Sequence, residues 1–259
     1  MELGLRGKLA VVTGGSHGIG LAIAKALAKE GCDLIICSRS LDRLQSAELE
    51  IAKFGTRVVT RQVDVLKPIE VEQFIDFVNK EFGTLHILIN NVGGGGRWGT
   101  DSIEETPLQV WSEVYEKNAG VAVRCIVGLL DLLRRQKWGR VITIGSIYGK
   151  EGGGRPWFNM AKAAEISLMK SLALRKDLVR DGITFNTVVP GSVMIKNTGW
   201  DEKQQTDPRA FSEFLADLPM GRLGSADEVA SMVAFLCSEQ AGWVNGAAIV
   251  VDGGESKSF

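Results

Sequence analysis

The stretch Thr13-Gly14-Gly15-Ser16-His17-Gly18-Ile19-Gly20 decides the fold of this chain. Its glycines at the spacing GxxxGxG stand between an apolar segment, Leu9–Thr13, and an amphipathic segment, Ile19–Glu30. A strand, a glycine-rich turn and a helix in this order bring backbone N–H groups and a helix N-terminus against a pyrophosphate. We therefore predict a dinucleotide-binding loop, with an idle turn as the alternative. The expected cofactor contacts are Gly14, Ser16, His17, Gly18, Ile19 and Gly20.

The same alternation of short apolar runs and longer amphipathic stretches continues along nearly the whole chain, which is typical of repeated βαβ units. A length of 259 residues suits one α/β domain. We predict a Rossmann-type, doubly wound parallel sheet of about seven strands in a single domain, residues 1–259. Strands are expected at Leu9–Thr13, Leu34–Cys37, Val58–Gln62, Ile87–Asn90, Val141–Ile144, Thr184–Val189 and Ala248–Val251, and helices at Ile19–Glu30, Leu41–Phe54, Glu70–Phe82, Pro107–Arg135, Trp157–Arg180 and Asp227–Leu236.

The composition excludes several classes of protein. With 45% hydrophobic and 24% charged residues it is that of a globular protein, and a net charge of -1 provides no basic field for nucleic acid. No apolar run is long enough to cross a bilayer, and the first residues lack the apolar block of a signal peptide, so we expect no membrane partner and a cytoplasmic location. Scattered cysteines without a CxxC pair, and few imidazoles, predict no metal site: Cys32, Cys37, Cys125, Cys237, His17 and His86.

The end of the second predicted strand indicates which dinucleotide is bound. An acidic residue there would hold both ribose hydroxyls of NAD, but the residues are Cys37-Ser38-Arg39. The Arg39 guanidinium, with His17 in the loop, favours a 2′-phosphate, so NADP(H) is favoured over NAD(H). Arg39 as a solvated charge at a helix start is the alternative. Asp64 and the Val65 backbone, after the third strand, are expected at the adenine, with a turn or helix cap as the alternative for Asp64.

Glycine clusters and one polar segment indicate where the substrate lies. Gly93–Gly96 and Gly152–Gly154 directly follow two strands, at the sheet edge where ligands bind in open α/β folds. The polar segment Lys196–Asp217 predicts a substrate lid near residues 192–222, or else a plain surface excursion.

Further motifs accompany the glycine loop: Asn90-Asn91-Val92-Gly93, Asn118, Ser146, Lys162, Pro190-Gly191 and the tail Val251-Asp252-Gly253-Gly254. As a set, these motifs resemble the short-chain dehydrogenase/reductase family, and within it the 3-oxoacyl-[acyl-carrier-protein] reductase type. The resemblance implies a seven-stranded sheet, a nicotinamide cofactor, hydride transfer to a carbonyl group and a homo-oligomer, either a dimer or a tetramer. It adds Asn91, Gly93, Lys162, Pro190, Gly191 and Val193 to the expected cofactor contacts.

The resemblance fails at the catalytic acid. The family uses Asn, Ser, Tyr and Lys, and Asn118, Ser146 and Lys162 match, but Phe158 stands four residues before the lysine where the tyrosine belongs. The i, i+4 spacing puts both side chains on one helix face. A phenyl ring has no proton to give, and positioned acid catalysis is usually worth about 10²–10⁴ in rate. A second departure is Ile195 at the position of a cofactor-binding threonine, which Thr198 is a candidate to replace.

Three interpretations of Phe158 remain open. The chain is a natural variant that obtains the proton elsewhere, a silent binder of cofactor and partner, or a Tyr-to-Phe exchange made to trap a complex. Tyr148, two residues beyond Ser146, would point to the same side in an extended segment and is a surrogate acid, or it merely packs in its loop. Lys162 acting through a ribose hydroxyl or a water chain is a further route.

The predicted function is NADP(H)-dependent oxidoreduction of a small-molecule carbonyl/alcohol pair, and the alternative is a catalytically silent member. Charged and aromatic residues in the loops and lid favour an anionic substrate with an apolar or sugar-ring body, although surface charge and packing also explain them. The apolar faces of the predicted helices Pro107–Arg135 and Trp157–Arg180 favour self-association. The loop and lid residues are Arg97, Lys150, Arg155, Trp98, Trp157 and Trp200.

Overall fold

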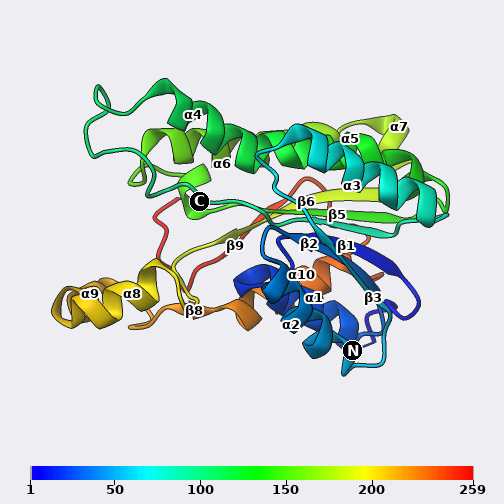
Figure 1. The fold of residues 1–259 in the computed structure, drawn as a ribbon, viewed down its shortest axis with the longest axis horizontal. Coiled ribbons are helices and arrows are strands. Elements are labelled where there is room, and N and C mark those ends of the chain that lie inside the picture. Colours follow the sequence, from blue (N-terminus) through cyan, green and yellow to red (C-terminus); the bar gives the residue numbers. More distant parts are fainter. Residues whose placement is uncertain (1, 259) are drawn as a thin grey trace.

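A seven-stranded parallel sheet runs through the centre of the molecule in the order β3-β2-β1-β4-β5-β6-β9 (Figure 1). The computed structural model describes residues 2–258. The strand order reverses between β1 and β4, which is the switch point where doubly wound folds hold ligands. The predicted class, a Rossmann-type α/β fold, is confirmed. The strands are β1 (Leu9–Thr13), β2 (Asp33–Ser38), β3 (Val58–Gln62), β4 (Ile87–Asn90), β5 (Gly139–Ile144), β6 (Ile183–Pro190) and β9 (Ala248–Val251).

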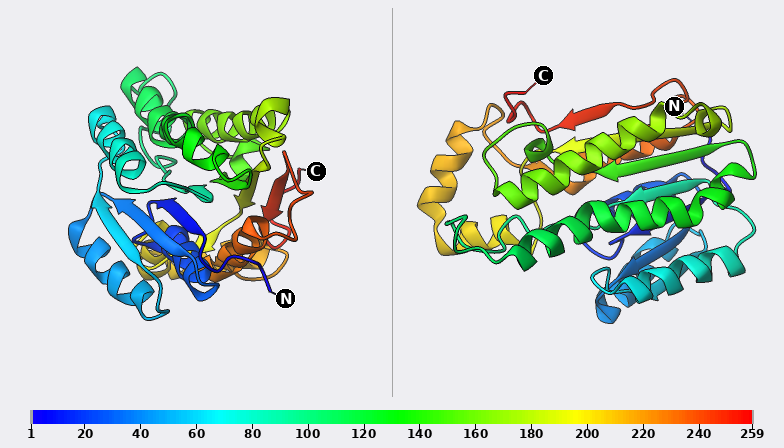
Figure 2. Two further views of the ribbon diagram at one scale, coloured as in Figure 1. Left: turned by 90° about the vertical axis from the view of Figure 1, so that its right-hand side faces the viewer. Right: turned by 90° about the horizontal axis from the view of Figure 1, so that it is seen from above.

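Helices cover both faces of the sheet because both faces of its strands are apolar. Along β1, Val11 and Val12 are both fully buried, but each belongs to a different core. Alternate side chains of a strand point to opposite faces, so each core lies between the sheet and one helical layer (Figure 2). One layer contains α1 (Gly18–Lys29), α2 (Leu41–Ala52) and α10 (Ala226–Cys237), and the other contains α3 (Pro68–Glu81), α5 (Val121–Arg134) and α6 (Pro156–Ala173).

The prediction of one continuous helix over Pro107–Arg135 is wrong in its middle. The structure has α4 (Leu108–Tyr115), a π-helical turn η1 (Glu116–Gly120) and then α5. Hydrophobic periodicity does not reveal such a turn, because the wider turn still continues the helix axis. Its effect is to carry Asn118 to full burial beside the loop that follows β4.

The helix predicted over Trp157–Arg180 also ends earlier than expected. The helix α6 stops at Ala173, and a short α7 (Lys176–Val179) follows. The side chain of Asn245, from the loop before β9, donates a hydrogen bond of 2.9 Å to the Ala173 carbonyl. A partner 72 residues away therefore satisfies a carbonyl that the helix end leaves open, and no local pattern signals it.

The segment predicted as a lid folds into a small unit of its own, beyond the carboxyl ends of the strands (Figure 1). It contains β7 (Val193–Met194), α8 (Gly199–Thr206), α9 (Pro208–Asp217) and β8 (Gly224–Ser225), and β7 pairs with β8. A minor apolar core around Phe211 holds α9 against the rest of the segment. None of the helices between residues 2 and 258 is long and apolar enough to cross a membrane.

Candidate active site

The loop between β1 and α1 has the shape that a dinucleotide needs. Gly14 and Gly18 have φ values of +67° and +56°, and a Cβ on Gly20 would lie 2.3 Å from the Gly14 carbonyl oxygen. Only glycine suits these positions, because the chain turns tightly and crosses itself closely. The Asn91 amide donates to the Thr13 carbonyl at 2.9 Å and to the Gly14 carbonyl at 3.3 Å, which fixes the loop to β4. The first amides of α1 thus face the crevice above the switch point.

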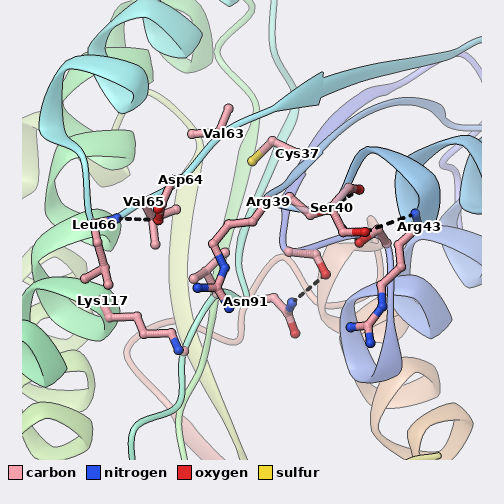
Figure 3. Close-up of a pocket in the computed structure, with 15 residues that line it drawn as sticks. Cys37, Arg39, Ser40, Arg43, Val63, Asp64, Val65, Leu66, Asn91 and Lys117 are labelled. Carbon is pink, nitrogen blue, oxygen red and sulfur yellow. Dashed lines mark hydrogen bonds between the residues drawn. The ribbon is translucent and has the colours of Figure 1, made fainter. Parts of the chain in front are cut away.

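A cavity of about 480 Å³ opens beside this loop and suits the 2′-phosphate and adenine end of the cofactor. Figure 3 shows the Arg39 side chain projecting into the cavity, with Arg43 on one side of it and Lys117 on the other. Ser16 Oγ donates to Ser38 Oγ at 2.7 Å on the cavity wall. Burial and then the charge of Arg39 lower the pKa of Lys117. Several cations without a salt-bridge partner among residues 2–258 indicate a site for an anion.

Sequence reasoning missed Arg43 and Lys117. Arg43 lies in the first turn of α2, where its amide donates to the Oγ of the N-cap Ser40 at 3.3 Å. The N-cap serine, Ser40, was visible in the sequence, and Arg43 stands three residues after it. A residue in this first turn lies close to the end of β2, so a contact of Arg43 with the cavity could have been predicted. Lys117 comes from the π-helical turn, far along the chain, and no local signal existed for it.

His17 lies elsewhere than predicted. It does not line the cavity of Arg39 and Arg43 but the neighbouring one, and burial and then the charge of Arg43 lower its pKa. A neutral imidazole adds no charge at the 2′-phosphate. Asp64 and Val65 do line the first cavity. Oδ1 of Asp64 accepts a hydrogen bond of 3.1 Å from the Leu66 amide, so Asp64 also closes a turn.

A second cavity, of about 500 Å³, shares Asn91 and Gly93 with the first and brings together predicted nicotinamide contacts and three of the five predicted catalytic residues, Ser146, Phe158 and Lys162. They come from five separate segments: the glycine loop, the end of β4, the end of β5, the helix α6, and the segment after β6. Such convergence at the carboxyl edge of a parallel sheet is what the topology predicts. The lining includes Gly18, Ile19, Gly20, Ser146, Phe158, Lys162, Pro190, Gly191, Val193, Ile195 and Thr198.

Phe158 occupies the place of the missing acid. Its ring centre is 5.9 Å from Nζ of Lys162 on the same face of α6, as the spacing predicts. A Cβ on Gly96 would contact the ring at 3.4 Å, so the loop after β4 also lies against it. The position therefore offers the cavity an apolar wall and no exchangeable proton.

The premise that favoured Tyr148 as a surrogate acid is wrong. Ser146 caps a 3₁₀ turn, η2 (Ile147–Gly149), and its Oγ accepts a hydrogen bond of 3.3 Å from the Tyr148 amide, so the segment is not extended. Tyr148 lines a third cavity, of about 540 Å³, and its ring meets Phe158 edge to face at 6.4 Å. Burial first, and then Glu255 and Glu151, raise its pKa, which makes Tyr148 a weaker acid than free tyrosine.

The side chain of Asn118 is hydrogen-bonded to the loop after β4, which forms the floor of the site. Its Nδ2 donates to the carbonyls of Val114 at 2.7 Å and Gly94 at 2.9 Å, and its Oδ1 accepts from the Gly94 amide at 3.1 Å. A Cβ on Gly93 would lie 2.7 Å from this Oδ1 and 2.9 Å from Nζ of Lys162, so Asn118 and the lysine flank the same glycine. The role of Asn118 in holding a lysine-linked water stays a prediction.

Lys162 is buried and held by two acceptors. Its Nζ donates to the Ile144 carbonyl and to Oε2 of Glu165, each at 2.9 Å. Sequence analysis missed Glu165, although an acid three residues after the lysine on a helix face that is otherwise apolar was a visible signal.

The third cavity, called the mouth below, lies between the loop after β4, η2, the start of α6 and α8. Arg97 and Arg155 line it, but Arg97 pairs with Glu202 at 3.2 Å and Arg155 with Asp101 at 2.9 Å. Of the three tryptophans named as recognition residues, only Trp200 lines the mouth. Trp157 is 1% exposed and packs in a core, Trp98 packs against that core, and neither they nor Lys150 lines the mouth.

Comparisons with known proteins match this architecture. The family profile for enoyl-(acyl carrier protein) reductase matches residues 14–256. The 3-oxoacyl-[acyl-carrier-protein] reductase FabG of Escherichia coli (strain K12) is 34% identical over 97% of this chain and 98% of its own. The FabG of Aquifex aeolicus (strain VF5) is 32% identical, over 98% and 99%.

Solved structures agree over the whole chain. L-sorbose reductase from Gluconobacter frateurii, complexed with NADPH and L-sorbose, superposes with a TM-score of 0.90 at 34% identity and covers 100% of both chains. The Pseudomonas aeruginosa RhlG/NADP complex gives 0.88 at 31% identity, over 98% of both chains. With its glycine loop, its Ser146–Lys162 cavity and these matches along its length, the chain belongs to the short-chain dehydrogenase/reductase family of oxidoreductases.

Proposed function

We propose that this chain is an NADP(H)-dependent oxidoreductase that interconverts a carbonyl compound and its alcohol, with Phe158 in the place of the usual acid. One observation carries the proposal. Two cavities that share Asn91 and Gly93 run across the carboxyl edge of the sheet, with Arg39 and Arg43 in one and Ser146 and Lys162 in the other. A dinucleotide with a phosphate at one end and a nicotinamide at the other suits this pair of cavities.

The choice of NADP(H) rests on the charges at the end of β2. Guanidinium groups bind phosphate oxygens strongly, and Ser38-Arg39 stands where an NAD site carries an acid. The L-sorbose reductase complex contains NADPH and the RhlG complex contains NADP, which supports the same choice.

The residues of the second cavity divide the work of the reaction. The nicotinamide supplies or accepts the hydride when it is bound. Ser146 Oγ donates a hydrogen bond to the substrate carbonyl oxygen and orients it. The Lys162 ammonium binds ribose hydroxyls, and Asn118 holds the loop that forms the floor. Phe158 excludes water from one side of the substrate but gives no proton. The alkoxide is therefore protonated by water or by Lys162, without the rate gain of about 10²–10⁴ from a positioned acid.

The alternative is a catalytically silent or engineered-inactive member that binds cofactor and a partner or substrate without turnover. The missing hydroxyl at Phe158 is the observation that favours it. Both proposals require cofactor binding, so only turnover separates them.

We propose a small carbonyl compound as substrate. The arginines of the mouth already have carboxylate partners, so at these residues an anionic substrate competes with Glu202 for Arg97 or with Asp101 for Arg155. Lys203 is the lining cation that forms no salt bridge among residues 2–258. The competition at the arginines favours neutral substrates that use Trp200 as an apolar wall.

Turnover of NADPH with neutral, acidic and phosphorylated carbonyl compounds tests the function. We expect measurable activity in the unmodified chain, with neutral compounds preferred, and a rise in kcat of about 10²–10⁴-fold in Phe158→Tyr. Phe54→Tyr, which adds a hydroxyl just after α2 and outside the site, is the matched control and leaves kcat unchanged.

Two other outcomes are decisive. An unmodified chain without turnover, beside an active Phe158→Tyr variant, establishes the silent alternative. Tyr148→Phe should leave activity nearly unchanged, because Tyr148 lines the mouth and not the cavity of Ser146. Its inactivity would identify Tyr148 as the acid after all.

We also propose a homo-oligomer, a dimer or tetramer, formed through the layer of α4, α5 and α6. Exposed apolar side chains project from these helices, among them Leu108 on α4 and Val127 on α5, which are 82% and 69% exposed. A reducing compartment such as the cytoplasm suits the four cysteines, which are all free and buried.

A further inference from the structure

Glu165 is a carboxyl group that the proposed reaction does not use, buried one helical turn beyond Lys162. It is 1% exposed, and its Oε2 lies 2.9 Å from Nζ of Lys162. Removing a carboxylate from water is costly unless it is paired and hydrogen-bonded. An apolar residue at this position would continue the buried stripe of Ala161, Met169 and Ala173 along α6. The acid therefore calls for an explanation beyond packing.

The surroundings of Glu165 are polar as well. Met169 and Ala173 of α6 share a core with Val141 of β5 and Phe185 of β6. Glu165 lies one turn before Met169 on α6, Thr143 lies two residues after Val141 on β5, and Thr187 lies two residues after Phe185 on β6. Each of these polar residues therefore lies on the same face of its element as its apolar neighbour. Asn90 of β4 stands in register with Thr143, so a row of buried polar side chains crosses three strands beneath α6. Within residues 2–258, Oδ1 of Asn90 and Oγ1 of Thr187 have no hydrogen-bond partner.

Glu165 sets the direction of the lysine. An ammonium group has three N–H donors. The Ile144 carbonyl and the Glu165 carboxylate accept hydrogen bonds from two of them. A Cβ added to Gly93 would lie 2.9 Å from Nζ, so Gly93 borders the ammonium on the side of the cofactor cavity. With both acceptors in place, the third N–H is directed to the crevice.

Glu165 is also the counter-charge of the lysine. The ring of Phe158 offers Lys162 no ionisable partner, and no other carboxylate among residues 2–258 forms a salt bridge with it. The elements packed against α6 carry other ionisable groups. They are Lys117 and Glu116 of η1, Glu113 and Tyr115 of α4, Tyr148, Lys150 and Glu151 in and after η2, Lys176 and Asp177 of α7, and Arg140 of β5. Burial raises the pKa of Glu165, and Lys162 alone opposes this.

We propose that Glu165 is a positioning residue for Lys162: its carboxylate keeps the buried ammonium charged and directed at the cofactor crevice, so that cofactor affinity depends on this one ion pair. The inference rests on the cofactor binding proposed above. It assigns Glu165 a role that is specific to a site without an acid at position 158, where the lysine has no other anionic neighbour.

The test is the pH dependence of NADPH affinity, measured by titration calorimetry from pH 6.5 to 9.5. The unmodified chain and the control Glu113→Gln, the same chemical change on the neighbouring helix α4, should agree to within about 2-fold at every pH, because any effect of Lys117 at the phosphate cavity is common to both. Glu165→Gln leaves a buried ammonium without a counter-charge, so its lysine loses the proton as pH rises. We expect its Kd to increase by about 10-fold or more relative to the unmodified chain between pH 6.5 and 9.5. Glu165→Asp restores the charge and should restore the profile of the unmodified chain.

A second readout does not depend on catalysis. Calorimetry in buffers of different ionisation enthalpy counts protons, and Glu165→Gln should take up about one proton more than the unmodified chain on binding NADPH at pH 9.

The outcomes separate this inference from the function on which it rests. An unmodified chain that does not bind NADPH overturns the proposed function. If it binds, and Glu165→Gln shows the same pH profile and proton count, the role of Glu165 is wrong. Should Glu165→Gln fail to fold by circular dichroism, the uncharged and similarly sized Glu165→Met replaces it, and a pH profile and proton count equal to those of the unmodified chain would contradict a carboxylate that keeps the ammonium charged.

Discussion

At the scale of single residues, the charged side chains in and beside the two cavities determine the electrostatics of the site. Arg39, Arg43 and Lys117 line the cavity at the end of β2, and Glu165 neutralises Lys162 in the other cavity. The two ends thus have opposite character: excess positive charge in the first and an internally balanced pair in the second. The proposed function assigns the phosphate of the cofactor to the first cavity, where it would neutralise part of this charge.

Replacing the arginines should weaken NADPH binding selectively. In Arg43→Ala a charge-assisted contact to the 2′-phosphate is lost, typically worth about 1.5–3 kcal/mol, so we expect the Kd for NADPH to rise by about 10- to 100-fold. The Kd for NADH, which lacks this phosphate, should change little. Arg39→Ala should behave alike, and exposed Arg180, which follows α7, provides a control as Arg180→Ala. Equal losses for both dinucleotides would contradict the assignment.

At the scale of elements, the π-helical turn η1 connects the loop after β4 to the helices α4 and α5. It displaces Asn118 to a position where its amide reaches both Val114, one turn back, and Gly94, in the loop after β4. A regular helix from Leu108 to Arg134 would break this register. Glycine-rich residues 93–96 therefore owe their conformation to a side chain 24 residues away.

Asn118→Ala should loosen this loop. Buried partners of the amide lose their hydrogen bonds, and we expect the free energy of unfolding in urea to fall by about 1–3 kcal/mol. Cleavage by trypsin after Arg97, which follows the glycines, should become faster in the variant. Ser112→Ala on α4, whose exposed hydroxyl only bonds back to its own helix, is the comparison and should leave both measurements unchanged. Unaltered cleavage in Asn118→Ala would mean that this side chain does not order the loop.

At the scale of the whole molecule, both helical layers expose large apolar side chains, and more of them lie on α4, α5 and α6 than on α1, α2 and α10. The layer of α1, α2 and α10 lies on the opposite side of the sheet from α4 and α5 (Figure 1). The helix α2 exposes Leu41 and Leu49, whereas α4 and α5 expose Leu108, Tyr115, Val123 and Val127. Burying such a surface against a second copy is the ordinary basis of a two-fold interface. The cofactor cavities open at the carboxyl edge of the sheet, so an interface on these helices leaves them accessible.

Val127→Glu should reduce the molecular mass measured by light scattering to that of a smaller species. A charge in the centre of an apolar interface costs several kcal/mol on association because it loses its water. Leu49→Glu is the matched control, since Leu49 on α2 is 71% exposed and lies in the opposite layer. An unmodified chain that is already monomeric would contradict the proposed assembly.

The strands, the glycine loop and the Phe158–Lys162 face were predictable from sequence because each depends on local periodicity or on a single turn. Strand positions agreed to within a few residues, since buried parallel strands are continuous apolar runs. The βαβ alternation then determines the topology, because crossovers between parallel strands have one hand.

Only the tertiary structure decided the rest. Whether Asn118 lies in a regular or a π-helical turn, and whether α6 stops at Ala173, depends on hydrogen bonds to partners distant in sequence. The separation of Tyr148 from Ser146, the approach of Arg43 and Lys117 to one cavity, and the burial of Glu165 follow from how loops and layers pack. Periodicity assigns a side chain to a face of its own element, but its neighbours and its solvation depend on what packs against that face.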